Sequence, residues 1–323
     1  MRNLKKLLCI FLCMAFGFGM AACTVQEAEP TAAETEDASI QINPLPEAVS
    51  KDKSTAQLYF GYMQEPLLVG ETRVFSIPIN ENSDAAIIKE LIKGPSTARA
   101  DFTPLINPDT KVINVRSEGN YLFVTLSKEF LQPPEDQLAV ESDVYEKTRK
   151  MLAVYSVVNA LIEQGNYSRV QILIDDEGTD SGRPITLAEA GLDGEGTTDA
   201  MERNGELVLN GPNTLREIMK CIENKSWDTL YKYISFKNLY GEDKPSAEDF
   251  KSEVTTAKLV ISDYTVGDEI LAPDGISEVV MASYTLKLRD GDAKTISNVP
   301  IRLIRENDVW KMTYTTFKKN FLS

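Results

Sequence analysis

An aromatic-free stretch, Thr24 to Thr55, most strongly limits how this chain of 323 residues can fold. The stretch is rich in Glu, Ala, Thr and Pro, so it has too little apolar surface to offset the entropy that is lost when a chain is ordered. We therefore predict that residues 23–55 form a disordered acidic tether. A folded core has to come from residues 56–323, which are enough for two small domains.

The first 22 residues have the layout of a secretion signal. They begin with three basic residues, Arg2, Lys5 and Lys6. The apolar run that follows, LLCIFLCMAFGFGM, is shorter than the roughly 20 residues that a transmembrane helix needs. The small residues Ala21 and Ala22 then precede Cys23.

This arrangement resembles a bacterial lipoprotein signal, although Met20 stands where that family most often has Leu. The resemblance implies cleavage between Ala22 and Cys23, diacylglycerol on the Cys23 sulfur and an acyl chain such as palmitate on its amine. Because two acyl chains suffice for stable anchoring, we expect a lipid-anchored protein on the extracytoplasmic face of the cell membrane. The alternative is ordinary signal-peptidase cleavage, with Cys23 incidental.

The composition argues against several functions. The chain has no histidine, so it lacks the commonest general base and the commonest metal ligand. Beyond Cys23 the remaining cysteine is Cys221, so we expect no intramolecular disulfide in the folded part, no metal site and no cofactor. The formal net charge of −15 would repel nucleic acid, which we therefore exclude as a partner.

Residues 56–178 show a mixture of strand and helix patterns. The predicted strands cover residues 57–63, 68–78, 110–117, 120–127 and 168–175, and the predicted helices cover 83–96 and 142–165. Ser83 or Asp84 can cap the first helix, and Gly94-Pro95 ends it. The apolar stripe predicted for the long helix consists of Val144, Thr148, Met151, Tyr155, Val158 and Ile162.

This order of elements and its motif residues resemble the GerMN domain family. The family pattern has a helix ending in Leu-x-x-Gly-Pro, then Pro-x-x-Thr-x-hydrophobic, then a strand ending in hydrophobic-Ser-x-x-Phe. The matching positions are Leu91, Gly94, Pro95, Pro108, Thr110, Val112, Leu126, Ser127 and Phe130. Thr125 departs from the family, which often has Asp there. The resemblance implies an endospore-forming or related Gram-positive bacterium and a role in sporulation or spore germination.

Two features of this region invite a chemical interpretation. Ser127 could be a nucleophile, but without histidine to activate it we interpret it as the cap of the short turn that follows. Asp175 to Pro184 (DDEGTDSGRP) could be a calcium loop, but it lacks a glycine at the sixth position and a closing acidic ligand. We interpret it as a solvated turn. Residues 179–206 are interpreted as an interdomain linker.

Residues 207–323 predict a second α+β domain. Two short helices, broken around Lys225-Ser226, precede four antiparallel strands at 258–267, 277–290, 294–307 and 309–317. Helices followed by such a meander resemble an NTF2-like domain with a curved sheet. We interpret Cys221 as a buried small hydrophobe, Tyr264 as core packing and Asp263 as solvated.

The sequence thus predicts an α+β protein of two small domains behind a signal and a tether. The leading functional hypothesis is a non-catalytic, lipid-anchored envelope protein that binds another envelope protein or a peptidoglycan-associated component. One alternative is a cell-wall hydrolase that uses paired carboxylates, which needs no histidine. Another is a carrier that holds a small ligand in a cavity of the second domain.

Overall fold

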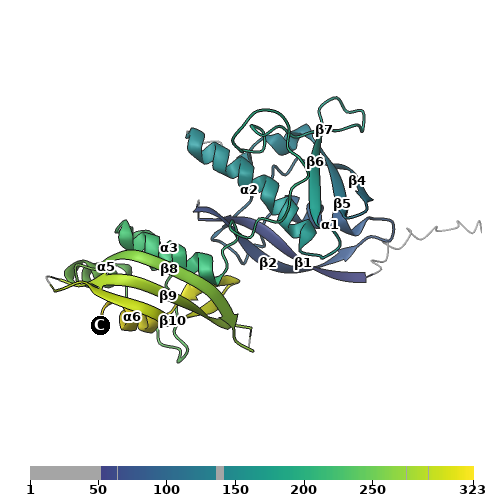
Figure 1. Cartoon of the computed structure of the whole chain (residues 1–323). Helices are drawn as coiled ribbons and strands as arrows, with labels where there is room; N and C mark the ends of the chain where they lie inside the picture. Colours follow the sequence, from purple (N-terminus) through teal and green to yellow (C-terminus); the bar gives the residue numbers. More distant parts are fainter. Residues whose placement is uncertain (1–51, 64, 136–141, 274, 290) are drawn as a thin grey trace, which may run out of the picture. The chain divides into compact units, whose positions relative to one another are not determined.

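The computed structural model describes residues 52–63, 65–135, 142–273, 275–289 and 291–323. The predicted signal peptide, Cys23 and most of the predicted tether lie outside the described residues. The described residues fall within one compact unit and have the expected α+β composition, with three separate sheets (Figure 1). We describe the region up to residue 210 first and then residues 211–323.

The first sheet is a long antiparallel hairpin with a short third strand, in the order β2-β1-β3. Its strands are β1 (Asp52–Tyr62), β2 (Glu65–Ile77) and β3 (Phe102–Thr103). The first strand begins at Asp52, so the last four residues of the predicted tether pair with β2 instead of being disordered. This pairing needs no apolar side chains, because the backbone makes the ladder hydrogen bonds.

The second sheet has the order β4-β5-β6-β7 and contains one parallel pair, β5 with β6. Its strands are β4 (Val112–Glu118), β5 (Tyr121–Ser127), β6 (Arg169–Asp175) and β7 (Arg183–Pro184). A parallel pair needs a long crossover, and here α2 (Asp143–Ile162) supplies it, after a 3₁₀ turn, η1 (Lys128–Leu131). The central position of β6 explains its nearly continuous apolar sequence.

The helices of this region lie between its two sheets. The long helix α2 contacts β1 and β2 on one side and β6 on the other, and α1 (Ser83–Ile92) packs beside it. The cap of α1 is Asn82, whose side chain accepts hydrogen bonds from two backbone amides, so the prediction of Ser83 or Asp84 was wrong. Asn82 has the extended backbone that a cap requires, whereas Ser83 is already helical.

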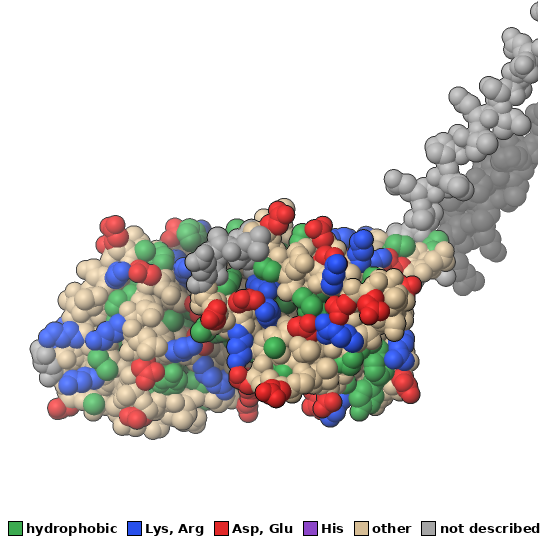
Figure 2. Space-filling view, turned by 90° about the horizontal axis from the view of Figure 1, so that it is seen from above, with side chains coloured by type: hydrophobic (Ala, Val, Ile, Leu, Met, Phe, Trp, Pro, Cys, Tyr) green, Lys and Arg blue, Asp and Glu red, His purple; other side chains and the backbone are tan. Residues whose placement is uncertain are grey.

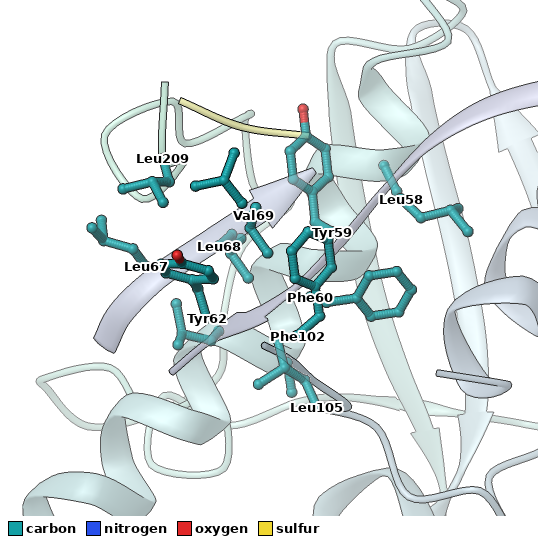
Figure 3. Close-up of a cluster of buried hydrophobic side chains, with 14 of the residues drawn as sticks. Leu58, Tyr59, Phe60, Tyr62, Leu67, Leu68, Val69, Phe102, Leu105 and Leu209 are labelled. Atoms are coloured by element: carbon teal, nitrogen blue, oxygen red, sulfur yellow. The ribbon is translucent and has the colours of Figure 1, made fainter. Parts of the chain in front are cut away.

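Contact with two sheets also widens the buried face of α2. Leu152, Val157 and Leu161 are buried although the predicted stripe omitted them, and Val144 of that stripe is exposed. The same core continues into the first hairpin, where aromatic and aliphatic side chains from β1, β2 and β3 pack together (Figure 3). The labelled members of this cluster are Leu58, Tyr59, Phe60, Tyr62, Leu67, Leu68, Val69, Phe102, Leu105 and Leu209.

Part of the segment interpreted as a linker is packed against this core. Ile185 and Ala190 are fully buried, and the Met201 backbone exchanges two hydrogen bonds with Val170 of β6. Gly191 has a positive φ of 68° and lies so close to α2 that a side chain there would clash with the Lys147 carbonyl. Position 191 therefore requires glycine, because of its backbone conformation and because there is no room for a side chain.

Residues 211–323 pair helices with a four-stranded antiparallel sheet of order β11-β10-β9-β8. The helices are α3 (Gly211–Glu223), α4 (Trp227–Lys232), α5 (Ala247–Thr256) and α6 (Tyr314–Phe321). The strands are β8 (Val260–Leu271), β9 (Ser277–Lys287), β10 (Lys294–Glu306) and β11 (Val309–Met312). The break between α3 and α4 and the four-strand meander confirm the predicted arrangement.

Two parts of the prediction for this region were wrong. Helix α5 was not predicted, and the predicted last strand ran through residues that form α6. Thr313 ends that strand because its side chain caps α6 by accepting from the Thr316 amide. The two missed helices bring Phe250 and Phe317 together, with ring centroids 5.2 Å apart. Phe321 continues this cluster to Tyr284 of β9, so aromatic rings fill the helix-facing side of the sheet.

The surface carries charges of both signs, and Lys/Arg and Asp/Glu side chains are interspersed on the face drawn in Figure 2. Among the described residues, no helix combines the length and the apolar character that crossing a bilayer requires.

Candidate functional site

Two of the motif positions of the first region, Gly94 and Pro108, line a groove of about 800 Å³ at the end of α1. We call it the proline groove. Its walls come from the end of α1, the loop before β4 and the segment after η1, and they include Ile92, Lys93, Gly94, Pro104, Asn107, Pro108, Pro133 and Pro134.

Gly94 shapes the first wall. The Lys93 and Gly94 amides close α1 by donating to the Lys89 and Leu91 carbonyls. Gly94 then takes a positive φ of 80°, the left-handed conformation that glycine adopts without strain. The chain can therefore turn directly from α1 toward Pro104, which faces Gly94 across the groove.

Asn107 ties the second wall to the third. Its side-chain oxygen accepts from the Asp109 amide at 2.9 Å, and its side-chain amide donates to the Pro133 carbonyl at 3.1 Å. The Thr110 amide donates to the Asn107 carbonyl, which completes a turn before β4. Asn107 is buried, so these bonds fix the separation of the two walls.

Ser127 supports the same loop from the end of β5. Its hydroxyl oxygen accepts from the Lys111 amide at 2.9 Å, and its own amide donates to the Lys111 carbonyl at 3.0 Å. Ser127 stands at the cap position of η1, but its hydroxyl oxygen makes no capping bond there, so the predicted cap was wrong. The hydroxyl oxygen instead accepts from the Lys111 amide just before β4, so Ser127 positions this loop.

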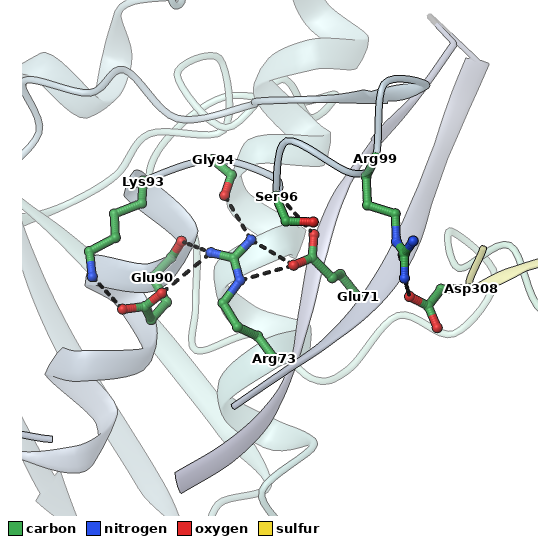
Figure 4. Close-up of polar contacts among 8 residues, drawn as sticks. All are labelled: Glu71, Arg73, Glu90, Lys93, Gly94, Ser96, Arg99 and Asp308. Carbon is green, nitrogen blue, oxygen red and sulfur yellow. Dashed lines mark hydrogen bonds and ion pairs between the residues drawn. The ribbon is translucent and has the colours of Figure 1, made fainter. Parts of the chain in front are cut away.

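A buried ion network holds the end of α1 in place (Figure 4). Arg73 of β2 donates to Glu71 at 2.8 and 2.9 Å and to the Gly94 carbonyl at 2.9 Å. It also bonds the backbone and the carboxylate of Glu90, at 3.1 and 3.4 Å. The second oxygen of Glu71 accepts from the Ser96 amide. Arg73 thereby joins the sheet to the residues that form the first wall of the groove.

This ion network was not predicted from the sequence. Glu71, Arg73 and Phe75 alternate along β2, so they share one face, and the burial of Glu71 and Phe75 shows that this face points inward. The sequence did hold a signal for the network, because charged residues stand at strand positions whose side chains point inward. What the sequence could not supply was the partner Glu90, which lies on a different element.

The groove surface itself offers proline rings and a few charged side chains. Proline has no amide hydrogen to donate, and its ring presents a flat apolar face. Within the groove, Asn107 is already engaged in holding the walls, as Ser127 is behind them. This surface is suited to contact with a partner chain, because its polar side chains serve the local fold.

The other residues singled out from the sequence do not join this groove. Asp175 is buried, and its carboxylate accepts from the amides of Gly178, Thr179 and Asp180, so backbone donors occupy the oxygens that a cation would need. No cluster of three or more metal-ligating side chains occurs in the described part of the chain. Asp263 is exposed, and Tyr264 is half-buried against the core.

Cys221 lies on α3 and is buried, as predicted. Burial, together with the nearby carboxylates of Glu65 and Glu217, raises the pKa of its thiol to about 12. A thiol with such a pKa is almost entirely protonated at neutral pH, so it is a poor nucleophile.

Comparison with known proteins identifies the first region. Residues 57–180 match the Germane family model, described as sporulation and spore germination. The solved tandem GerMN domains of the sporulation protein GerM from Bacillus subtilis are 14% identical over 52% of this chain and 50% of that chain, with a TM-score of 0.34. The match thus spans half of the tandem structure.

The first GerMN domain of the same Bacillus subtilis protein is 18% identical over 41% of this chain and 94% of that chain, with a TM-score of 0.27. No curated protein matches the chain. The family match covers the segment in which the motif residues were recognised. The chain therefore carries a GerMN domain, the module of the Germane family, in residues 57–180.

Proposed function

We propose that this chain is a non-catalytic binding module of sporulation or spore germination, held by lipid at Cys23 on the outer face of the cell membrane. Its partner is another envelope protein or a peptidoglycan-associated component. The observation that carries the proposal is the proline groove, because Asn107, next to the motif residue Pro108, and the motif residue Ser127 hold its walls and leave proline rings on its surface.

The state of the buried carboxylates supports a binding role over hydrolysis. A glycosidase needs two free carboxyl groups facing one space. Glu71 and Glu90 are neutralised by Arg73, and Asp175 is held by backbone amides. Asp84 accepts a hydrogen bond from the Tyr167 hydroxyl. Glu278 is buried as well, but its carboxyl group lies against Gly211 at the start of α3.

A groove variant tests the binding role. Pro108 lines the groove and is exposed, so Pro108→Arg changes its surface without disturbing the core. Pro184→Arg is the matched control at an exposed proline of β7. We expect cross-linking in sporulating cells to give a defined partner with the wild type and with Pro184→Arg, and to lose it with Pro108→Arg. Equal recovery with both variants would show that the groove is not the binding surface.

Activity on the cell wall provides the second test. The purified full chain, incubated with peptidoglycan, should release no soluble fragments. Release of muropeptides at a rate proportional to the protein concentration would establish the hydrolase alternative and overturn the non-catalytic proposal.

Membrane attachment is tested by Cys23→Ser, with Cys221→Ala as the control for loss of a cysteine. We expect Cys23→Ser to move the protein from the membrane fraction to the medium, because no acyl chain can be added at that position. Cys221→Ala should remain in the membrane fraction. A Cys23→Ser protein that stayed with the membrane would contradict lipid anchoring at Cys23.

A further inference from the structure

A second pocket, of about 560 Å³, brings three lysines together in a chain whose net charge is −15. The lysines are Lys232 at the end of α4, Lys244 in the loop before α5, and Lys311 on β11. The other walls include Tyr62, Asp101 and Tyr231. We call it the lysine pocket. None of its lining residues belongs to the proline groove.

Lys244 is fixed in position and has donor capacity left. Its ammonium donates to the Tyr231 carbonyl at 2.9 Å and to the Ile234 carbonyl at 2.8 Å. It also lies 3.9 Å from the centre of the Tyr231 ring. An ammonium group has three N–H donors, so the third is free for another acceptor. Because the side chain is already ordered, a ligand would not have to offset the entropy of ordering it.

The surroundings of Lys244 disfavour its positive charge. Burial and the like charge of Lys311 lower the pKa of Lys244 to about 8, although the Glu306 and Asp101 carboxylates act in the opposite direction. Lys311 is paired with Glu306 at 3.1 Å, and Lys232 has no ion-pair partner within 4.0 Å among the described residues. An added negative charge would relieve this repulsion.

Tyr62 forms part of the pocket wall. Its side chain is 1% exposed, and its hydroxyl has no hydrogen-bond partner among the described residues. Burial, followed by the carboxylates of Asp101, Glu306 and Glu65, raises the pKa of this hydroxyl, so it stays protonated and adds no negative charge beside the lysines.

We propose that the lysine pocket binds an oxyanionic group, phosphate or carboxylate, of a small molecule. Lys232, Lys244 and Lys311 supply positive charge, and the third N–H of Lys244 supplies a donor. Lysine binds such groups as a point charge without the paired geometry that arginine imposes, which suits both tetrahedral and planar anions. The volume lies within the range of small-molecule sites.

Calorimetric titration of the full chain in detergent tests this proposal with sulfate as the tetrahedral probe and succinate as the carboxylate probe. Saturable binding of sulfate alone would indicate phosphate-bearing ligands, and binding of succinate alone would indicate carboxylates. We expect Lys232→Gln and Lys244→Gln each to weaken binding about tenfold, since each removes one charge from the site. Lys319→Gln, at an exposed lysine of α6, is the matched control and should leave binding unchanged.

Lys244→Gln also removes two hydrogen bonds to carbonyls, so its fold is checked by thermal unfolding. Lys232 is exposed, and Lys232→Gln therefore tests the pocket without that complication. The proposal fails if neither anion binds saturably. It also fails if Lys232→Gln binds the anion as tightly as the wild type and the control Lys319→Gln do.

The pH dependence gives an independent readout, because the charge of sulfate is constant. The groups that face Lys244 are Lys311, Glu306, Asp101 and the Tyr231 ring. Deprotonation of Lys244 removes positive charge, so sulfate affinity should fall as the pH rises from 7 to 9. In Lys244→Gln the affinity should stay flat over that range. The same fall in Lys244→Gln as in the wild type would assign the titration to another group and exclude Lys244 from the site.

Discussion

Buried carboxylates are paired with a cation in one region of this protein and lack such a partner in the other. In the GerMN region, Glu71 and Glu90 share Arg73, and each buried charge has an opposite charge within hydrogen-bond distance. In residues 211–323, Glu278 of β9 is 3% exposed, and its Oε1 has no hydrogen-bond partner among the described residues. A buried charge is costly unless it is paired with an opposite charge or neutralised by a proton. The two regions use one of these solutions each.

Strand register explains why Glu278 is buried at all. Val280, Ala282, Tyr284 and Leu286 point inward along β9, and Glu278 occupies the same phase. Its Oε1 lies against Gly211 at the start of α3, where an added Cβ would overlap it. Burial and the nearby Glu269 charge raise the pKa of Glu278 to about 7, against the opposing effect of Arg305. This region avoids a buried charge by keeping the carboxyl protonated below that pH.

The largest effect that this comparison predicts is for Arg73→Met. The change leaves Glu71 buried without its cation and leaves Glu90 with its pair to Lys93, and breaking a buried pair costs about 3–5 kcal/mol in comparable cases. Urea unfolding at pH 7 measures the loss of folding free energy. Arg169→Met is the control, because Arg169 pairs with Glu202 on the surface and such pairs contribute about 0–1 kcal/mol. Equal losses in both variants would remove the distinction between buried and exposed pairs.

The second prediction concerns pH. In the unfolded chain, a glutamate ionises near pH 4.3, whereas Glu278 in the folded chain ionises near pH 7. The unfolded state therefore holds fewer protons between these values, and the stability contribution of Glu278 falls as the pH rises through this window. Glu278→Gln should abolish this loss, so it should stabilise the protein by up to about 3 kcal/mol above pH 7 and change little near pH 4.

Denaturant unfolding of wild type and Glu278→Gln at pH 4.5, 6 and 8 measures this window. Glu195→Gln, at an exposed glutamate, is the control for the removal of one negative charge. A difference between wild type and Glu278→Gln that did not depend on pH would show that Glu278 has the same protonation in the folded and unfolded states.

The smallest predicted effect concerns the helix caps, for which we expect a similar loss of stability in the two regions. Asn82 caps α1 by accepting from two amides, and Asn210 caps α3 by accepting from one. Replacing either by Ala should cost about 1 kcal/mol in thermal unfolding, with Asn82 the larger. Helix capping is local, so it should not depend on the surrounding region. A several-fold larger loss at Asn210 would indicate that the buried Glu278 near this helix start is coupled to the cap.

Local patterns allowed much of the first region to be predicted from its residues. The alternation of Leu122, Val124 and Leu126 with Tyr121, Phe123 and Thr125 identified β5, and the first three are buried. The motif positions identified the GerMN domain. Helices α5 and α6 were missed because their sequences are strongly polar or β-branched. Their few apolar residues stabilise the helices only through tertiary contacts, in which Phe250, Phe317 and Phe321 pack together.

The candidate sites could be predicted less well. Gly94 and Pro108 were recognised, but not that they line one groove, because that requires the loop after η1 to return beside them. The lysine pocket left no signal in the sequence. Lys232, Lys244 and Lys311 are separated by long intervals and lie near Tyr62 only in the folded chain.

The sequence by itself determined the type and order of most elements, the absence of histidine chemistry and the family of the first region, since all of these depend on residue identity and short-range periodicity. Only the tertiary structure decided which buried charges are paired. Arg73 meets Glu90, and Glu278 meets Gly211, through contacts between elements distant in the chain. The free energy of a buried charge depends on its neighbours in space, so no local pattern can show whether that charge is paired, protonated or available to a ligand.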